Sequence, residues 1–349
     1  MIKQETFSLE NIKRIQKEYG VDPELAQRAI FALGLVESLL KVKTQFIFKG
    51  GSSLMLLFDI PKRLSTDVDI IVDENYDIDG CINKASNIFP FISVEESIRL
   101  TAKNISKKHY RFTYLSPIRG KEITVILDVL FAKDCYAKTI SKPINNVFLI
   151  NDGDDYIVKI PSIESILGDK LTAFAPHTIG IRFNNDSFSN DKRLEVIKQF
   201  YDVSLLFDVA KNYEEVQNTY HAIAEQEIKY RNLNITPNEC LMDSFNSALS
   251  LLSFGKFYKD DYQQLLEGIN RIKTHIVGNK LSMHYIPAFA SKIMLLSACL
   301  IKDINPFSIK IEHKEMLKDS PYNQINFLLK ISNQEAYDYA VTAINILFE

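Results

Sequence analysis

The sequence predicts an α+β fold in which a mixed N-terminal domain is followed by a helical C-terminal domain. Two strand-like runs, 109–115 and 122–131, are rich in β-branched and aromatic residues. From about residue 162 onward, apolar residues recur at the three- and four-residue spacing typical of amphipathic helices. The predicted domains are residues 1–160 and 161–349, and a chain of 349 residues is long enough for both.

Composition and charge exclude several classes of protein. A formal net charge of −3 excludes a globally basic nucleic-acid coat, while a local basic patch stays compatible with it. The four cysteines lack the spacing of a zinc site, which favours free thiols in a reducing compartment. The N-terminus has no apolar core typical of a signal peptide, and the most apolar stretch, 284–301, contains His284 and Lys292. We therefore expect a cytoplasmic protein with no membrane partner.

The first elements follow one another closely along the chain. Residues 8–43 are predicted to be helical, with Asp22-Pro23 as a helix-start signal. The remaining elements expected before residue 100 are a short segment at 45–49 that leads into a double glycine, a brief helix at 53–58, a strand at 67–73 and a helix at 81–99.

The later elements are clearer. The runs 109–115 and 122–131 are joined by a loop with Pro117 and Gly120, which predicts a hairpin. Six helices that each bury one apolar face are expected after it, near 162–175, 191–211, 237–253, 260–276, 284–302 and 334–348.

Two carboxylates, Asp67 and Asp69, lie on the strand at 67–73. Residues two apart on a strand point to the same face, so these anions lie side by side and repel each other. A divalent cation removes that repulsion, and carboxylate oxygens suit Mg²⁺. An isolated pair of this kind is more often two solvated aspartates, so the pair alone does not identify a site.

Two further features favour a metal and phosphate site. Asp128 interrupts an otherwise apolar strand, where a charge is costly to bury unless it is paired or binds a metal. Gly50 and Gly51 are followed by Ser52 and Ser53, and the backbone N–H groups of such a turn form a cradle for phosphates. A triphosphate and two metals are what phosphoryl chemistry requires, because the metals bridge phosphate oxygens, activate the attacking hydroxyl and neutralise the leaving pyrophosphate.

These motifs carry a family resemblance. K-G-G-S-S-L at 49–54 followed by R-L-S-T-D-V-D at 63–69 resembles the signature of AbiEii-type nucleotidyltransferase toxins. That family belongs to the DNA polymerase β-like nucleotidyltransferase superfamily and is related to the mycobacterial MenT enzymes. D-K-L-T-A at 169–173 resembles the family's K-x-x-A helix, and K-Q-F-Y-D-V at 198–203 resembles its later helix with an aspartate. The four motifs span about residues 45–210.

The resemblance implies a polymerase β-like domain with a mixed β-sheet, an NTP substrate and Mg²⁺, with two ions during catalysis. It implies a third metal carboxylate on a later strand, for which Asp128 is the candidate beside Asp67 and Asp69. It also implies that Asp202 orients or activates the acceptor. The nucleotide-binding residues expected are Gly50, Gly51, Ser52, Ser53, Arg63, Ser65 and Lys170.

Several of these residues have a structural alternative that the sequence leaves open. Lys170 would ordinarily be a solvated helix residue, and Asp202 lies one turn after Lys198, as in a surface ion pair. Arg63 and Ser65 either touch phosphate or cap a turn. His177, in a loop between the two later motifs, is expected to be structural or exposed.

Residues 99–121 contain seven Lys or Arg and no Asp or Glu. Tyr110, Phe112 and Tyr114 alternate with Arg111 and Thr113, so one strand face is aromatic. One interpretation is a track for a nucleic-acid backbone. The other, favoured for the strand itself, places the aromatics in the core and the cations in solvent.

The resemblance predicts a toxin of a toxin–antitoxin or abortive infection system that transfers NMP to an acceptor, with the 3′ end of tRNA as the leading choice. A cognate antitoxin encoded nearby is implied, and whether it binds directly stays open. Two alternatives remain: the acceptor is a protein hydroxyl or a small molecule, or the protein binds NTP without catalysis.

Overall fold

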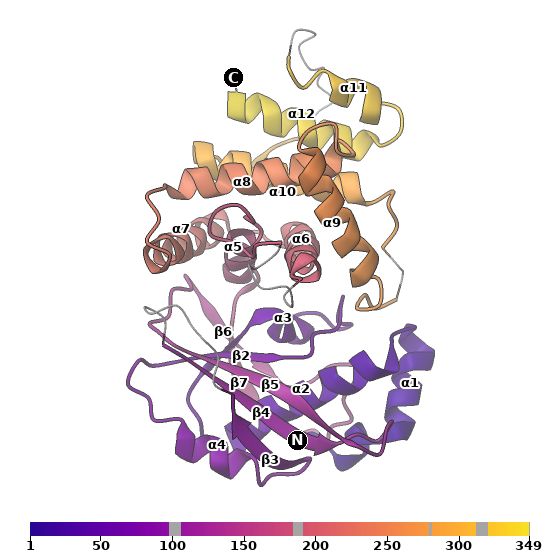
Figure 1. The fold of residues 1–349 in the computed structure, drawn as a ribbon, viewed down its shortest axis with the longest axis vertical. Coiled ribbons are helices and arrows are strands. Elements are labelled where there is room, and N and C mark those ends of the chain that lie inside the picture. The colour runs from indigo at the N-terminus through magenta and orange to yellow at the C-terminus, as the bar shows by residue number, and fades with distance from the viewer. Residues whose placement is uncertain (98–105, 184–190, 279–280, 312–319, 349) are drawn as a thin grey trace. The chain divides into compact units, whose positions relative to one another are not determined.

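The computed structural model describes residues 1–97, 106–183, 191–278, 281–311 and 320–348. The chain divides into two compact units (Figure 1). The first comprises Met1–Asp134, Thr139–Ser162 and Thr274–Lys280, and the second comprises Cys135–Lys138, Ile163–Lys273 and Leu281–Glu349. The first unit thus includes the late segment Thr274–Lys280, and the second includes the early segment Cys135–Lys138.

The first unit combines helices with two sheets, which confirms the predicted α+β class. Its helices are the 3₁₀ turns Gln4–Phe7 and Leu54–Leu56, and α1 (Leu9–Tyr19), α2 (Pro23–Lys41), α3 (Gly50–Ser53) and α4 (Asp79–Ala85). Its strands are β1 (Ile47–Lys49), β2 (Val68–Val72), β3 (Phe91–Glu96), β4 (Lys107–Leu115), β5 (Glu122–Phe131), β6 (Thr139–Pro143) and β7 (Ile157–Pro161).

The larger sheet is mixed, with the strand order β1-β2-β5-β4-β3. Strand β2 pairs parallel with β5, and the other neighbours are antiparallel. Parallel neighbours need a long connection, and here α4, β3 and β4 lie between β2 and β5 in the sequence. Strands β6 and β7 form a separate antiparallel pair. The hairpin predicted from 109–115 and 122–131 is confirmed as β4 and β5.

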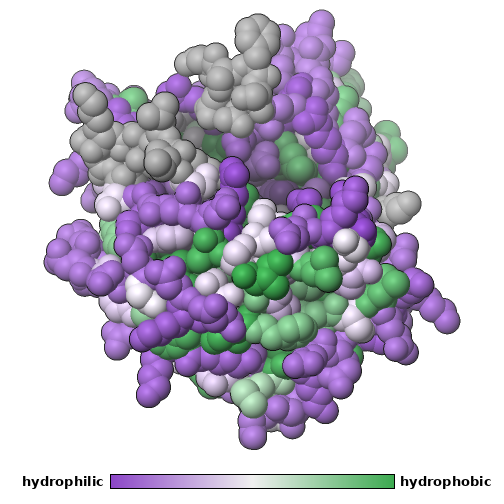
Figure 2. Space-filling view, turned by 60° about the horizontal axis from the view of Figure 1, so that its bottom comes forward, coloured by the Kyte–Doolittle hydropathy of each residue, from purple (hydrophilic) through white to green (hydrophobic). Residues whose placement is uncertain are grey.

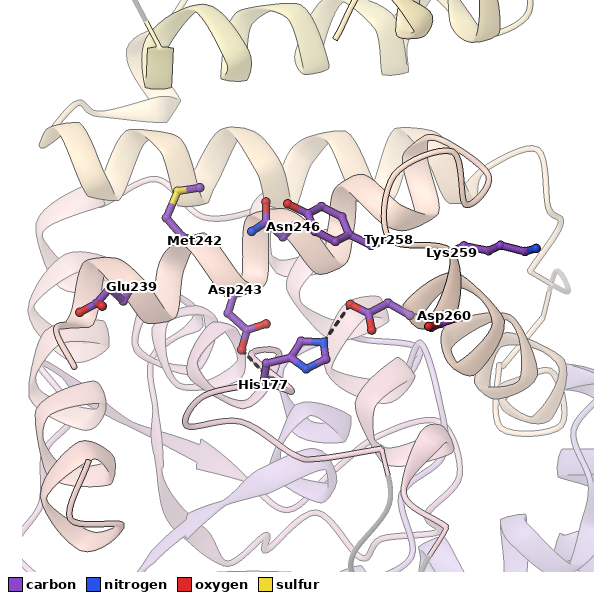
Figure 3. A pocket seen from close by; sticks show the side chains of 9 residues that line it. His177, Glu239, Met242, Asp243, Asn246, Tyr258, Lys259 and Asp260 are labelled. Carbon is purple, nitrogen blue, oxygen red and sulfur yellow. Dashed lines mark hydrogen bonds and ion pairs between the residues drawn. The ribbon is translucent and has the colours of Figure 1, made fainter. Parts of the chain in front are cut away.

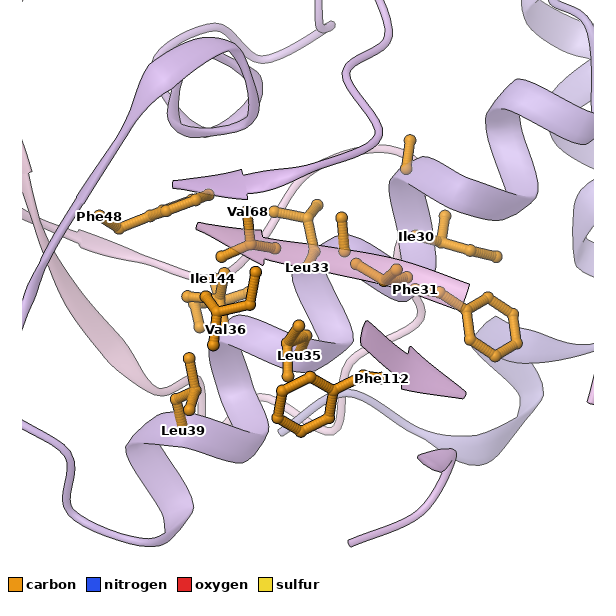
Figure 4. Close-up of a cluster of buried hydrophobic side chains, with 14 of the residues drawn as sticks. Ile30, Phe31, Leu33, Leu35, Val36, Leu39, Phe48, Val68, Phe112 and Ile144 are labelled. Atoms are coloured by element: carbon orange, nitrogen blue, oxygen red, sulfur yellow. The ribbon is translucent and has the colours of Figure 1, made fainter. Parts of the chain in front are cut away.

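Helix α2 carries much of the core under this sheet. It begins where Asp22 accepts a hydrogen bond from the Leu25 amide at 3.0 Å, with Pro23 in the first turn, where its missing N–H costs nothing. Its apolar residues are buried nearly all round, as expected of a helix inside a domain. They lie against sheet residues such as Phe48 and Val68 (Figure 4).

Strand β3 is an edge of the sheet and carries exposed apolar side chains. Ile92 is 56% exposed, and Phe89 and Leu115 nearby are also exposed. Figure 2 shows apolar and hydrophilic side chains interspersed on one face of the molecule. Glu95 and Glu96 on the same strand are exposed, and charges at an edge disfavour pairing with a further strand.

The second unit is helical in the described residues. Its helices are α5 (Ile163–Ala173), α6 (Arg193–Phe207), α7 (Tyr213–Tyr230), α8 (Pro237–Leu252), α9 (Lys259–Ile272), α10 (Ile286–Lys302), a 3₁₀ turn at Pro306–Ser308, α11 (Gln324–Leu329) and α12 (Gln334–Phe348). Helix α10 is buried along most of its length, and the Lys292 ammonium within it pairs with Asp208 at 2.9 Å and Glu335 at 3.2 Å. No helix in the described ranges has the length and apolarity needed to cross a membrane.

Three expectations about the elements were wrong. The helix predicted at 81–99 ends at Ala85 and gives way to β3, because Pro90 disfavours helix at the residue before it and removes a backbone donor. The brief helix begins at Gly50 rather than at 53, and it is a single α-helical turn followed by a 3₁₀ turn. The helix expected over 8–43 is interrupted by Gly20, which ends α1 at a positive φ of 65°.

Other elements carry too weak a pattern to be predicted. Helix α7 has few buried residues, namely Val216, Thr219, Tyr220 and Ala224, and its outer faces are polar. Strands β6 and β7 are five residues long, and each includes a Lys and a Pro. Neither shows the apolar periodicity on which the predictions relied.

Candidate active site

A row of charged and polar residues crosses one face of the larger sheet. In register, Lys49 on β1 lies opposite Asp69 on β2, which lies opposite Asp128 on β5. Asp128 in turn lies opposite His109 on β4. Side chains at the same register on neighbouring strands share a face, and neighbouring strands are about 4.8 Å apart. The fold thus brings Asp69 and Asp128, which are 59 positions apart in the sequence, side by side.

The glycine loop packs directly on Asp69. Gly50 has a φ of +75°, and a Cβ added there would overlap the Asp69 Oδ2 atom. A Cβ at Gly51 would lie 2.7 Å from both Arg63 Nη2 and Ser65 Oγ. Only glycine permits these close approaches, so Gly50 lies against the Asp69 carboxylate while Gly51 lies against Arg63 and Ser65.

The two serines of the loop hold its conformation. Ser52 Oγ donates a hydrogen bond to the Asp67 carbonyl, and Ser53 Oγ donates to the Gly50 carbonyl at 2.9 Å. Both side chains are buried. Their contact with phosphate stays a prediction. In the structure, Ser52 ties α3 to the residue before β2, and Ser53 closes the turn of α3 itself. Because α3 has four residues, its helix dipole contributes little to a phosphate cradle.

Arg63 is placed by a segment from much later in the sequence. Its residue is 5% exposed, and it pairs with Ile276 in an isolated antiparallel bridge. The Leu64 amide donates to the His275 carbonyl at 2.7 Å, and the Val277 amide donates to the Lys62 carbonyl at 3.1 Å. Sequence reasoning missed this support, because nothing in the local pattern links residues so far apart.

The three predicted metal carboxylates differ in their surroundings. Asp67 precedes β2 and is exposed, while Asp69 and Asp128 are half-buried. Their oxygen donors suit Mg²⁺ in kind. Among the described residues, however, no three His, Cys, Asp or Glu side chains are gathered closely enough to hold a metal ion. Carboxylates repel one another without a cation, so binding would require these three to converge.

Asp128 has a partner that the sequence did not reveal. The His109 Nδ1 and Asp128 Oδ1 atoms are 2.6 Å apart. The His109 side chain is 10% exposed and the Asp128 side chain 32%. The prediction that a charge in this apolar strand must be paired or bind a metal is met by a pairing, and the register of β4 with β5 creates it.

The later motifs form a buried polar cluster in the second unit. The Lys170 Nζ atom lies 3.3 Å from Asp202 Oδ2 and 3.0 Å from Gln199 Oε1. The Lys170 and Asp202 side chains are 8% and 2% exposed. The alternatives of a solvated Lys170 and of a surface Asp202 are therefore wrong. Gln199, whose amide also donates to the Glu195 carbonyl, was missed by sequence reasoning.

The aromatic residues of the basic segment belong to the core. Tyr110, Phe112 and Tyr114 are buried, so the interpretation that places the strand aromatics in the core is correct. Lys108 forms an ion pair with Asp79 at 2.7 Å, and this bond, together with one from Tyr110, holds the pKa of the Asp79 carboxyl below its usual range. Arg119 pairs with Glu24 at 2.8 Å, and Arg99 and Lys103 lie outside the described residues.

His177 borders a cavity of about 480 Å³ within the second unit (Figure 3). Its Nε2 atom lies 2.8 Å from Asp261 Oδ2, and its backbone amide donates to Asp243 Oδ2 at 2.8 Å. The bond to Asp261 raises the pKa of His177, and burial raises the pKa of Asp243. These bonds anchor the loop after α5, in agreement with the expected structural role.

Comparisons with known proteins place these features in a family. The family described as nucleotidyl transferase AbiEii toxin, type IV toxin–antitoxin system, matches residues 35–292. Among solved structures, JHP933 from Helicobacter pylori is 12% identical with a TM-score of 0.42, over 80% of this chain and 94% of its own. An antigenic nucleotidyltransferase-like protein from Paracoccidioides brasiliensis is 18% identical with a TM-score of 0.35, over 58% and 89%. No curated protein sequence matches the chain significantly.

Proposed function

We propose a reaction for this chain, which belongs to the nucleotidyl transferase AbiEii toxin family of type IV toxin–antitoxin systems. The protein transfers NMP from an NTP to the 3′ end of an RNA, and that RNA is tRNA. The acceptor hydroxyl oxygen bonds to the α-phosphorus, and the bond from that phosphorus to the pyrophosphate oxygen breaks. Pyrophosphate leaves, and the hydroxyl proton is lost. An NTP and a tRNA meet in the cytoplasm, where we place the reaction.

The observation that carries this proposal is the packing of the glycine loop on the carboxylate row. Gly50 lies against Asp69, and Asp69 lies beside Asp128 in register. A loop held open by glycine next to two acidic side chains provides a place where phosphate and a cation meet. Asp67, Asp69 and Asp128 would hold Mg²⁺. Bound there, Mg²⁺ would neutralise phosphate charge and polarise the α-phosphorus.

The remaining predicted residues bind and orient the substrates. The Arg63 guanidinium lies beside Gly51, and we assign to it the binding of phosphate oxygens, to which a guanidinium offers paired N–H donors. Ser65 and the amides of Gly51 to Ser53 complete this set. In the second unit, the family resemblance assigns Lys170 to phosphate and Asp202 to the acceptor. These two side chains form a buried ion pair with each other.

The test is label transfer with the purified protein, Mg²⁺, each α-labelled NTP in turn and total RNA. We expect one or more NTPs to label tRNA, and we expect Asp67→Ala and Asp69→Ala to reduce transfer at least 100-fold, because each removes a carboxylate that compensates phosphate and metal charge. Asp59→Ala, at an exposed carboxylate in the same unit, is the matched control.

The labelled species separates the alternatives. Label in protein or in a small molecule would replace the RNA acceptor. NTP binding without transfer to any species, equal in the wild type and in Asp67→Ala, would leave a binding protein and remove the enzymatic proposal. The family implies an antitoxin partner. Co-purification of the two gene products would show whether that antitoxin binds this chain directly.

A further inference from the structure

Among the residues that the structure describes, His109 is the one neighbour whose side chain forms a hydrogen bond with Asp128. The two residues face each other across β4 and β5, with 2.6 Å between Nδ1 and Oδ1. The His109 residue is 8% exposed, so its ring is held within the sheet packing. The histidine is the more deeply buried member of the pair, and the half-buried carboxylate is the more exposed one.

The chemistry of the contact defines its direction. An ionised carboxylate has only acceptor oxygens, so the hydrogen between the two atoms belongs to Nδ1 of the imidazole. A charge-assisted hydrogen bond of this length restricts the rotation of the carboxylate and holds its Oδ1 atom near the imidazole. Since Asp69 lies on the other side of Asp128 in register, His109 holds the carboxylate from the side opposite Asp69.

We propose that His109 is a positioning residue for the metal site, and that its Nδ1–H donor orients the Asp128 carboxylate toward the position shared with Asp69. The inference rests on the proposed function, because it assigns a purpose to the Asp128 carboxylate in that site. A carboxylate ligand that accepts a hydrogen bond on the side away from the cation binds that cation in one orientation. It therefore loses less conformational freedom on binding. His109 itself touches neither the cation nor the nucleotide.

A purely structural histidine would behave differently. If His109 only filled space in the sheet, any side chain of similar size would serve, and its loss would lower stability without a specific change in cation affinity. If it positions Asp128, a donor at the same place is needed. Asparagine supplies such an N–H donor, because its Nδ2 atom is bonded to Cγ, as the imidazole Nδ1 atom is.

The experiment measures Mn²⁺ binding alone, by electron paramagnetic resonance of free and bound ion, in the full chain without nucleotide. The variants are His109→Ala, His109→Asn and His109→Phe, with His284→Ala as the control because that side chain is exposed in the second unit. We expect His109→Ala and His109→Phe to bind Mn²⁺ 10- to 100-fold more weakly, as for other residues that orient metal ligands. His109→Asn should stay close to the wild type. Thermal unfolding identifies variants that have lost the fold.

Each outcome decides the proposal. Wild-type Mn²⁺ affinity in folded His109→Ala, or equal losses in His109→Asn and His109→Phe, would overturn the donor role while leaving the proposed function intact. If the wild type transfers nucleotide and binds Mn²⁺, and only the variants without a donor bind Mn²⁺ more weakly, the proposed function and the role of His109 are both supported. A wild type that binds no Mn²⁺ overturns the metal site itself, and this inference with it. Should His109→Ala not fold, the comparison of His109→Phe with His109→Asn carries the test.

Discussion

Gly50 shows how one residue can join backbone conformation to site chemistry. Its φ of +75° lies in the left-handed region, and the space where a Cβ would stand is filled by Asp69 Oδ2. An alanine there would meet both penalties at once. Gly120, in the loop between β4 and β5, shares the positive φ at +62° but has nothing within 4 Å of its Cβ position. Comparing an alanine substitution at each glycine therefore distinguishes the effect of backbone strain, which both share, from the effect of displacing Asp69, which only Gly50 has.

Gly50→Ala is expected to reduce nucleotide transfer on the order of 100-fold, because Asp69 must move and small displacements of this kind have large kinetic effects. Gly120→Ala should cost only about 1–2 kcal/mol of stability and leave transfer unchanged. The measurements are label transfer and the urea dependence of unfolding. Equal activity of the two folded variants would show that the contact with Asp69 is dispensable.

At the residue scale, the sequence could predict what lies close along the chain and little of what the sheet or the helices bring together. Gly50 and Asp69 were predictable because their motifs are short and their chemistry is specific. His109 and Gln199 were not. Each is an ordinary residue in its local pattern and gains its role from a partner 19 or 29 positions away, through strand register or helix packing.

At the scale of elements, the loop after α5 is held to two other helices. The His177 amide bonds to Asp243 on α8, and its ring bonds to Asp261 on α9. The bond to Asp261 raises the pKa of His177 above its ordinary value of 6.5. Because the folded-state pKa is the higher one, the stabilisation is complete below pH 6.5 and is lost as pH rises through the folded-state pKa.

His177→Gln should therefore remove a pH-dependent part of the stability. We expect the wild type to lose stability relative to this variant as pH is raised from 6.5, with the difference levelling off once the histidine is neutral in both states. The raised pKa of Asp243 adds its own pH dependence, but that group is present in both proteins. Melting temperatures from pH 5.5 to 8.5 provide the measurement, with His284→Gln as control. A constant difference across this range would contradict the assignment.

Elements were predictable in proportion to the strength of their apolar pattern. Helix α10 and the β4–β5 hairpin have strong patterns and were placed within a few residues. The segment 81–99 misled, because its mixed pattern fits a helix until Pro90 is given its full weight. Helix α7 was missed because most of its surface is polar, so packing against α5 rather than periodicity identifies it. Gly168 on α5 permits that packing, since a Cβ there would lie 2.7 Å from the Val216 carbonyl.

At the scale of the whole molecule, neither unit is one continuous stretch of the sequence, because each includes a short segment that lies within the other's stretch. The main change from the first to the second unit falls between Ser162 and Ile163, but Thr274–Lys280 returns to the first unit and Cys135–Lys138 belongs to the second. A boundary near 160 that is predicted from helical periodicity has no means of detecting such returns, because they are a few residues long and are recognised only by contacts with distant segments.

The returning segment predicts that a change far from the motifs will act on the candidate site. The Val277 amide donates to the Lys62 carbonyl, next to Arg63, so Val277→Pro removes that donor and loosens the segment that places Arg63. Val277→Ala keeps the N–H and serves as the matched control. We expect Val277→Pro to raise the KM for NTP about tenfold, with faster exchange of the Leu64 amide hydrogen, because the guanidinium near Gly51 is no longer held. Steady-state kinetics and hydrogen exchange measure the two effects. An unchanged KM with rapid Leu64 exchange would show that Arg63 is placed without help from this segment.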